Sequence, residues 1–169
     1  MILRVILASL FLALALPAAA DEMRISVKDA KGRPVENAVV TLHPQGQSSG
    51  AIKFSWPMRI DQKDYQFDPF VLIAPVGATV TFPNLDDTRH HVYSFSKAGR
   101  FELRLYGKDE AKSAQFNKVG VIVVGCNIHD QMSAYIYVVD TPFASKTGPD
   151  GVAVLANVPR GVGSLSVWH

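Results

Sequence analysis

Cysteine is nearly absent from this sequence, and its scarcity narrows what the protein can be. Cys126 is the single cysteine among 169 residues, so no disulfide can form within the chain. An unpaired thiol in an oxidising compartment needs burial or a metal to hold it. For an exported protein, the lone cysteine is therefore a candidate metal ligand.

An excess of one charge sign is also missing. The chain has 17 Lys and Arg against 15 Asp and Glu, for a net charge of +2, and like charges form no run. A basic run or patch is what proteins commonly use to bind nucleic acid or anionic membranes, so we expect neither as a partner. The sequence also has no amphipathic helical period, no internal repeat and no low-complexity tract, so nothing favours a helical or repeat architecture.

The only long apolar run lies at the N-terminus. Arg4 precedes the apolar residues 5–16, and Pro17 with three alanines follows. This order is typical of a secretory signal peptide, whereas a membrane span needs about 20 apolar residues. We expect residues 1–20 to be removed on export to the periplasm, with no stable membrane insertion afterwards. An uncleaved membrane anchor is the alternative.

The rest of the chain favours an all-β fold. It is long enough for one domain, or for one domain with a small appendage. Short β-branched and aromatic runs alternate with turn residues, which favours a β-sandwich with Greek-key connections. The expected strands lie at 60–69, 71–77, 79–82, 92–95, 101–105, 119–124 and 134–139. A turn of helix is expected, if anywhere, within 107–116.

The two ends of the chain predict a second, smaller β module. Residues 23–27 and 35–42 flank a turn and are predicted to form a β-hairpin. The pattern Asp-x-x-Gly-x-Pro-Val-x-x-Ala-x-Val within 29–40 resembles the start of carboxypeptidase-regulatory-like or transthyretin-like sandwiches, and 146–168 resembles their closing half. The predicted division is a signal peptide at 1–20, the hairpin and a linker at 21–50, the main domain at 51–139 and a C-terminal β segment at 140–169.

A heptad after the apolar run 119–124 carries the chemistry. Cys126, His129 and Met132 place a thiolate, an imidazole and a thioether three residues apart. Together with a second imidazole, these groups are the ligand set of a blue-copper electron-transfer site, so copper is the expected cofactor. The candidates for the second imidazole are His90 and His91. The alternative is that the cysteine and methionine are ordinary core residues.

Residues 67–139 resemble a cupredoxin. The resemblance is carried by Phe-x-Pro at 67–69, Val-Gly-x-Thr-Val-Thr-Phe-x-Asn at 76–84, the histidine at 90 and Cys-x-x-His-x-x-Met at 126–132. The short ligand loop is similar to that of amicyanin, the electron acceptor of methylamine dehydrogenase. The residues around 89–95 and 125–130 resemble periplasmic methylamine-utilisation proteins. The fold implied is a cupredoxin-like Greek-key sandwich.

The resemblance also implies roles for particular residues. Adjacent strand residues point to opposite faces, and the spacing from Asn84 matches His90 to the first ligand position. His91 stands where the family usually has Asn, whose backbone N–H donates to the thiolate; His91 as the ligand is the alternative. Asn84 is expected to join the two ligand loops by hydrogen bonds, or to be an ordinary turn residue. Gly125 is expected to allow close approach of the backbone beside the thiolate, or to relieve crowding. The implied ligands are His90, Cys126, His129 and Met132.

The function implied is a periplasmic one-electron carrier, linked by the resemblance to methylamine oxidation. Redox partners are expected to dock transiently near His129, whose loop position favours an exposed imidazole edge. The alternative is a copper-holding or copper-delivery protein that uses the same ligands without redox turnover. An enzyme is not expected, because multicopper oxidases and nitrite reductases need further histidines, typically His-x-His pairs, and the sequence has no such pair.

Overall fold

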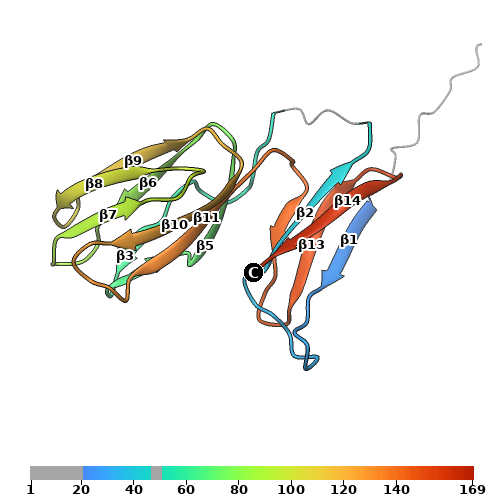
Figure 1. The fold of residues 1–169 in the computed structure, drawn as a ribbon, viewed down its shortest axis with the longest axis horizontal. Helices are drawn as coiled ribbons and strands as arrows, with labels where there is room; N and C mark the ends of the chain where they lie inside the picture. Colours follow the sequence, from blue (N-terminus) through green and yellow to red (C-terminus); the bar gives the residue numbers. More distant parts are fainter. Residues whose placement is uncertain (1–20, 47–50) are drawn as a thin grey trace, which may run out of the picture.

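A computed structural model describes residues 21–46 and 51–169. Every regular element within these residues is a β-strand, which confirms the all-β class. The expected signal peptide at 1–20 and part of the expected linker lie outside the described residues. No helix in the described part of the chain is long and apolar enough to cross a membrane. Figure 1 shows two β lobes side by side.

The larger lobe is a two-layer sandwich. One layer is a sheet in the order β5-β11-β10-β7-β8, in which only the β5–β11 pair is parallel. These strands are β5 (Val71–Pro75), β11 (Ser133–Val139), β10 (Gly120–Cys126), β7 (His90–Ser94) and β8 (Phe101–Tyr106). The other layer contains the antiparallel pairs β6–β9 and β3–β4, namely β6 (Ala78–Pro83), β9 (Ala111–Phe116), β3 (Asp61–Lys63) and β4 (Gln66–Asp68). Bridges from Arg59 and Gln62 to the β6 segment join these two pairs.

Burial alternates along the central strands, as it must where one face of a sheet covers a core. On β10, Ile122 and Val124 are buried and the intervening Val123 is exposed. Cys126 has the same parity, so its side chain also faces the space between the layers, where it is 3% exposed. The apolar strand pattern therefore directs the thiol inward.

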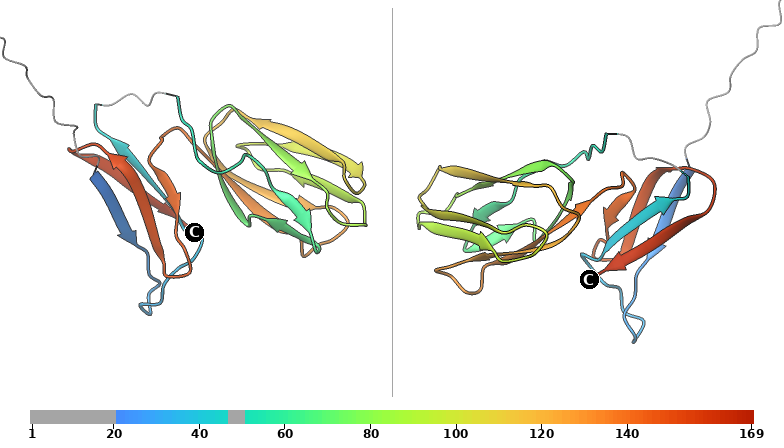
Figure 2. Two further views of the ribbon diagram at one scale, coloured as in Figure 1. Left: turned by 180° about the vertical axis from the view of Figure 1, so that it is seen from behind. Right: turned by 45° about the horizontal axis from the view of Figure 1, so that its top comes forward.

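The smaller lobe is built from both ends of the chain. β1 (Asp21–Ser26) pairs with β13 (Val152–Val158), and β2 (Val39–Pro44) lies between β12 (Ala144–Lys146) and β14 (Gly163–Trp168). Figure 2 shows these first and last strands together from two further sides. Their common core consists of Val40, Leu42, Ala153, Leu155 and Val158.

The predicted N-terminal hairpin is wrong in its pairing. β1 and β2 belong to different sheets, and the turn between them is closed by the Lys28–Pro34 bridge and by backbone hydrogen bonds from Asp29 to Arg33 and from Val35 to Val27. The carboxylate of Asp29 accepts the backbone N–H groups of Lys31 and Arg33, which holds that turn locally. Residues 39–42 of β2 are buried, so their backbone N–H and C=O groups need hydrogen-bond partners on neighbouring strands at both edges. The distant strands β12 and β14 supply them.

The helical turn expected within 107–116 is also wrong. Residues 111–116 form β9, which pairs with β6 over six residues. Every residue from Ala111 to Phe116 has a partner on β6, and Phe116 closes the core at the end of the strand. Tertiary pairing thus overrides a weak local preference.

A shared apolar interface joins the two lobes. Val39 and Ala144 of the smaller lobe pack with Val71, Ile73 and Val139 of the larger one. Aromatic side chains extend the contact: the ring of Trp168 lies 5.2 Å and 5.6 Å, centroid to centroid, from the rings of Tyr135 and Tyr137. The smaller lobe therefore covers the outer face of the sheet at β5 and β11.

The docking of the two chain ends can be tested at Gly151. This residue has φ +72°, and an added Cβ would lie 2.7 Å from the carbonyl oxygen of Val27, whereas Gly32 has φ +78° and nothing within 4 Å of its Cβ position. Gly32→Ala is expected to lower the free energy of unfolding by about 1–2 kcal/mol through conformation alone. Gly151→Ala should cost about 1–3 kcal/mol more because of overpacking. Urea unfolding measures both values, and equal losses would contradict the docked arrangement.

Candidate metal centre

The loop between β10 and β11 is closed by its own backbone. The N–H of Cys126 donates to the carbonyl oxygen of Met132 at 3.3 Å, and the N–H of Met132 donates to the carbonyl oxygen of His129 at 3.0 Å. The second bond turns the chain at 129–132 back on itself. His129 is thereby brought to the same end of the sandwich as Cys126.

Strand register brings His90 to the same place from β7. β7 pairs antiparallel with β10, with Val92 opposite Cys126 and Tyr93 opposite Gly125. Residues opposite each other share a face of the sheet, as do residues two apart on a strand. His90 and Cys126 therefore point to the same side.

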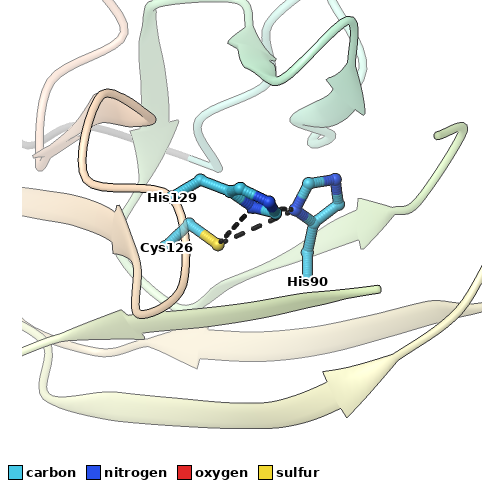
Figure 3. Close-up of side chains that lie close together, drawn as sticks. All are labelled: His90, Cys126 and His129. Atoms are coloured by element: carbon cyan, nitrogen blue, oxygen red, sulfur yellow. Dashed lines mark hydrogen bonds between the residues drawn. The ribbon is translucent and has the colours of Figure 1, made fainter. Parts of the chain in front are cut away.

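Three side chains converge on one point (Figure 3). The Nδ1 atoms of His90 and His129 each lie 3.7 Å from the Sγ of Cys126 and 3.2 Å from each other. A single ion at about 2.3 Å from sulfur and about 2.05 Å from each nitrogen would span these separations with N–metal–S angles of about 116° and an N–metal–N angle of about 103°. These atoms fit one metal ion with an open side. No other cluster of at least three such donors occurs among residues 21–46 and 51–169.

The three donors differ in their access to solvent. His90 is fully buried, Cys126 almost so, and His129 is partly exposed. Asp130, which follows His129, is exposed. The donor set is therefore closed on the β7 side and open to the surface only at His129.

His91 points away from this group. Its Nε2 lies 3.0 Å from a carboxylate oxygen of Glu102, and its side chain is 15% exposed. Its carbonyl oxygen accepts the N–H of Asn127 at 2.9 Å, which joins β7 to the ligand loop. The structure thus brings His90, and not His91, beside Cys126; that His90 binds the metal stays a prediction.

Met132 lies on the same face as Cys126. It is buried in the same core cluster, and its position two residues before the buried Ala134 on β11 gives it the inward parity. The predicted role of its thioether as an axial ligand stays a prediction.

Asn84 has partners that the sequence did not indicate, whereas Gly125 is in the crowded position that one of its two expected roles requires. The Nδ2 of the buried Asn84 donates to the carbonyl oxygens of Thr88 and Tyr106, and its Oδ1 accepts the N–H of Asp86. These bonds order the segment before His90 and differ from the expected tie between the two ligand loops. At Gly125 an added Cβ would lie 3.3 Å from the ring of Tyr93, which agrees with relief of crowding.

Asp86 is a further residue of the site that the sequence did not indicate. One carboxylate oxygen of Asp86 lies 2.8 Å from the Nε2 of His90, and the carboxylate also accepts the backbone N–H groups of Asp64 and Tyr65. Burial raises the pKa of Asp86, but the hydrogen bonds from His90, Tyr65 and Asp64 outweigh burial, so its pKa lies below the ordinary value. A carboxylate four residues before a histidine carries no signal in a loop, so no motif could have found it.

Tyr65 is a second residue of the site that the sequence did not indicate. Its ring meets the ring of His129 edge-on, with centroids 5.0 Å apart and planes at 78°, and lies 6.1 Å from the ring of His90. Tyr65 stands in the turn between β3 and β4, about 60 residues before His129 in the sequence. Only tertiary structure brings the two together.

A polar pair lies in the core near the thiol. The Tyr106 hydroxyl donates to the carbonyl oxygen of Phe82 and accepts from Gln62 Nε2. Burial raises the pKa of Tyr106, and the nearby charge of Cys126 adds to this shift. The phenol therefore stays protonated and supplies a fixed dipole beneath the site.

The choice between the two adjacent histidines can be tested by metal titration of the metal-free protein. His90→Ala removes a donor and should weaken Cu(II) binding by more than the roughly 10–100-fold that loss of an outer-shell partner costs. His91→Ala should leave the affinity close to that of the wild type, because the His91 imidazole faces Glu102. The reverse order of affinities would assign the ligand role to His91.

Comparisons with known proteins give likenesses of fold. No protein-family model and no curated protein matches the chain. Among solved structures, the chain is similar to the copper-containing nitrite reductase of Thermus scotoductus, at 30% identity and a TM-score of 0.46 over 57% of this chain and 25% of the reductase. It is also similar to a purple cupredoxin of Nitrosopumilus maritimus, at 22% identity and TM-score 0.43 over 48% of this chain and 98% of the cupredoxin. A reduced variant of amicyanin matches at 22% identity and TM-score 0.45, over 59% of this chain and 98% of amicyanin. The chain thus spans about a quarter of the reductase and nearly all of the two smaller proteins.

Proposed function

We propose that this protein is a type 1 copper protein that carries one electron at a time between redox partners. The observation that supports the proposal is the convergence of His90, Cys126 and His129 at separations that one ion can span. A thiolate with two imidazoles suits copper, since sulfur favours Cu(I) and imidazole serves Cu(II). Bound copper would supply the change of one electron between these two states.

The protein's contribution is to keep the donors in place. His90 and Cys126 lie on neighbouring strands of one sheet, and two backbone hydrogen bonds close the loop that carries His129. A donor set held by a sheet moves little when the charge of its metal changes. Little movement means a low barrier to electron transfer. Because the transfer of an electron breaks no bond, we propose no catalytic role for the chain.

The surface around His129 is suited to brief encounters. The exposed apolar groups here are Tyr65, whose ring meets His129, and Ile128, which precedes His129. Leu85, which precedes Asp86, is exposed as well. Weak redox complexes commonly bury less than about 1,200 Å², so a patch of this kind is large enough. We propose that partner proteins dock here and that electrons pass by way of His129.

The proposed location is the periplasm. Its support is the signal-peptide pattern of residues 1–20 and the unpaired Cys126, which copper would protect in an oxidising compartment. A link to methylamine oxidation is proposed on the resemblance of the ligand-loop sequence alone.

The decisive test is a visible spectrum of the copper-loaded protein. A thiolate bound to Cu(II) should give an intense blue or green colour that bleaches on reduction, and Cys126→Ser should abolish it. Copper should also slow alkylation of Cys126, because the bound thiolate is not free to react. A copper-loaded protein that stays colourless under oxidant would overturn the proposal.

The docking patch can be tested through electron self-exchange. Ile128→Glu places a charge beside His129 and should slow self-exchange markedly while leaving the spectrum intact. Val119→Glu is the matched control, since Val119 is 49% exposed and Ile128 46%, but Val119 precedes the opposite end of β10. Equal rates in the two variants would remove this route and favour copper holding or delivery.

A further inference from the structure

The hydrogen bond between Asp86 and His90 determines which ring nitrogen of His90 can face a metal. Asp86 Oδ2 lies 2.8 Å from His90 Nε2, and the other nitrogen, Nδ1, lies 3.7 Å from Cys126 Sγ. A carboxylate only accepts hydrogen bonds, so Nε2 carries the hydrogen and Nδ1 keeps its lone pair. Partners of this kind fix the tautomer and the orientation of ligand histidines.

The same carboxylate holds a second element. Its Oδ1 accepts the N–H of Asp64 at 2.7 Å, and its Oδ2 accepts the N–H of Tyr65 at 3.1 Å. Asp64 and Tyr65 have φ of 54° and 59°, in the left-handed region that residues other than glycine seldom adopt. Two consecutive residues of this kind form the tight turn that joins β3 to β4. Asp86 therefore stabilises a turn whose sequence contains no glycine.

That turn places the Tyr65 ring beside the metal site. The Tyr65 ring lies edge-on to His129, with centroids 5.0 Å apart, and its hydroxyl lies 2.9 Å from Thr88 Oγ1. Thr88 is itself fixed, because its carbonyl oxygen accepts a hydrogen bond from Asn84. The Tyr65 side chain remains 44% exposed, so it forms the outermost layer over the partly exposed imidazole.

These contacts combine into one arrangement. We propose that Asp86 is a positioning residue for both imidazoles, acting directly on His90 and, by way of the Asp64–Tyr65 turn, on His129, which Tyr65 shields from solvent. This inference rests on the proposed copper site. The carboxylate side chain is only 10% exposed, so its negative charge lies close to the metal position with little screening and favours the more positive state, Cu(II).

The variant Asp86→Asn removes the charge and one acceptor oxygen while keeping the shape. Loss of such an outer-shell partner should weaken Cu(II) binding by about 10–100-fold. Cu(I) binding should weaken less, which raises the reduction potential; each tenfold change in the ratio of the two affinities corresponds to about 59 mV for one electron. Asp87→Asn is the matched control, because Asp87 is adjacent but 89% exposed and pairs with Lys108. If the potentials and affinities of the two variants are the same, the inference is wrong.

A pair of substitutions tests the shield separately. Tyr65→Ala should accelerate removal of copper by an excess of chelator, because it uncovers the imidazole of His129. Tyr65→Phe keeps the ring and loses only the bond to Thr88, so its rate should stay close to that of the wild type. Equal rates for wild type, Tyr65→Phe and Tyr65→Ala would overturn the shielding role.

A measurement without metal separates this inference from the proposed function. In the NMR spectrum of the metal-free wild type, His90 should carry its hydrogen on Nε2, in a slowly exchanging signal that Asp87→Asn retains and Asp86→Asn alters. A hydrogen on Nδ1 instead would overturn the inference even if the Asp86 variant did not fold. Absence of a thiolate band in the copper-loaded wild type, with the Nε2 signal as expected, would overturn the copper function and leave the positioning role of Asp86 supported.

Discussion

The short pairing of β7 with β10 is the constraint on which the site depends. Only two residue pairs are matched, Tyr93 with Gly125 and Val92 with Cys126, yet they fix the face and the height of the donors on both strands. A shift of one residue would turn His90 outward and present His91 to the thiol. The buried Val92 of β7 holds this register, since it would have to leave the core if β7 slipped by one residue. Apolar packing and ligand geometry are thus set by one alternation.

Local signals were sufficient for much of the prediction. The strand segments follow from short β-branched and aromatic runs between turn residues, which the sequence displays directly. A period of two also shows that only one of His90 and His91 can face Cys126. The choice of His90 came from the resemblance, through its spacing from Asn84. The predicted hairpin was wrong because a turn motif does not determine whether the two strands that flank it pair with each other. β2 pairs instead with strands more than 100 residues later in the sequence. Asp86 and Tyr65 could not be found because loops carry no period and because the turn at 64–65 meets the site only through tertiary folding.

Polar groups near the thiol add a second requirement to the apolar one. The fully buried Gln62 and Tyr106 bond to each other and to the carbonyl oxygen of Phe82, so the core beneath Cys126 contains oriented dipoles. In surroundings of low dielectric constant such dipoles act strongly on a nearby charge. A thiolate bound to a metal whose charge changes by one unit would feel a fixed field here. This field is present without any reorientation of water. A low barrier to electron transfer requires that little has to reorient when the charge changes.

The smaller lobe and the site use different surfaces of the same sheet. Residues 71–74 of β5 are buried on both faces, which an outer strand achieves only if something covers its outside, and the packing of Trp168 on Tyr135 and Tyr137 marks that cover. The apolar side chains beside His129 nevertheless keep their exposure with the smaller lobe in place: Tyr65 is 44% and Ile128 46% exposed. The docking proposed at this site would therefore not compete with the contact between the lobes. The smaller lobe stabilises the β5–β11 edge by burying apolar surface. The proposed docking needs apolar surface that stays exposed, and this is found where the ligand loop reaches the surface.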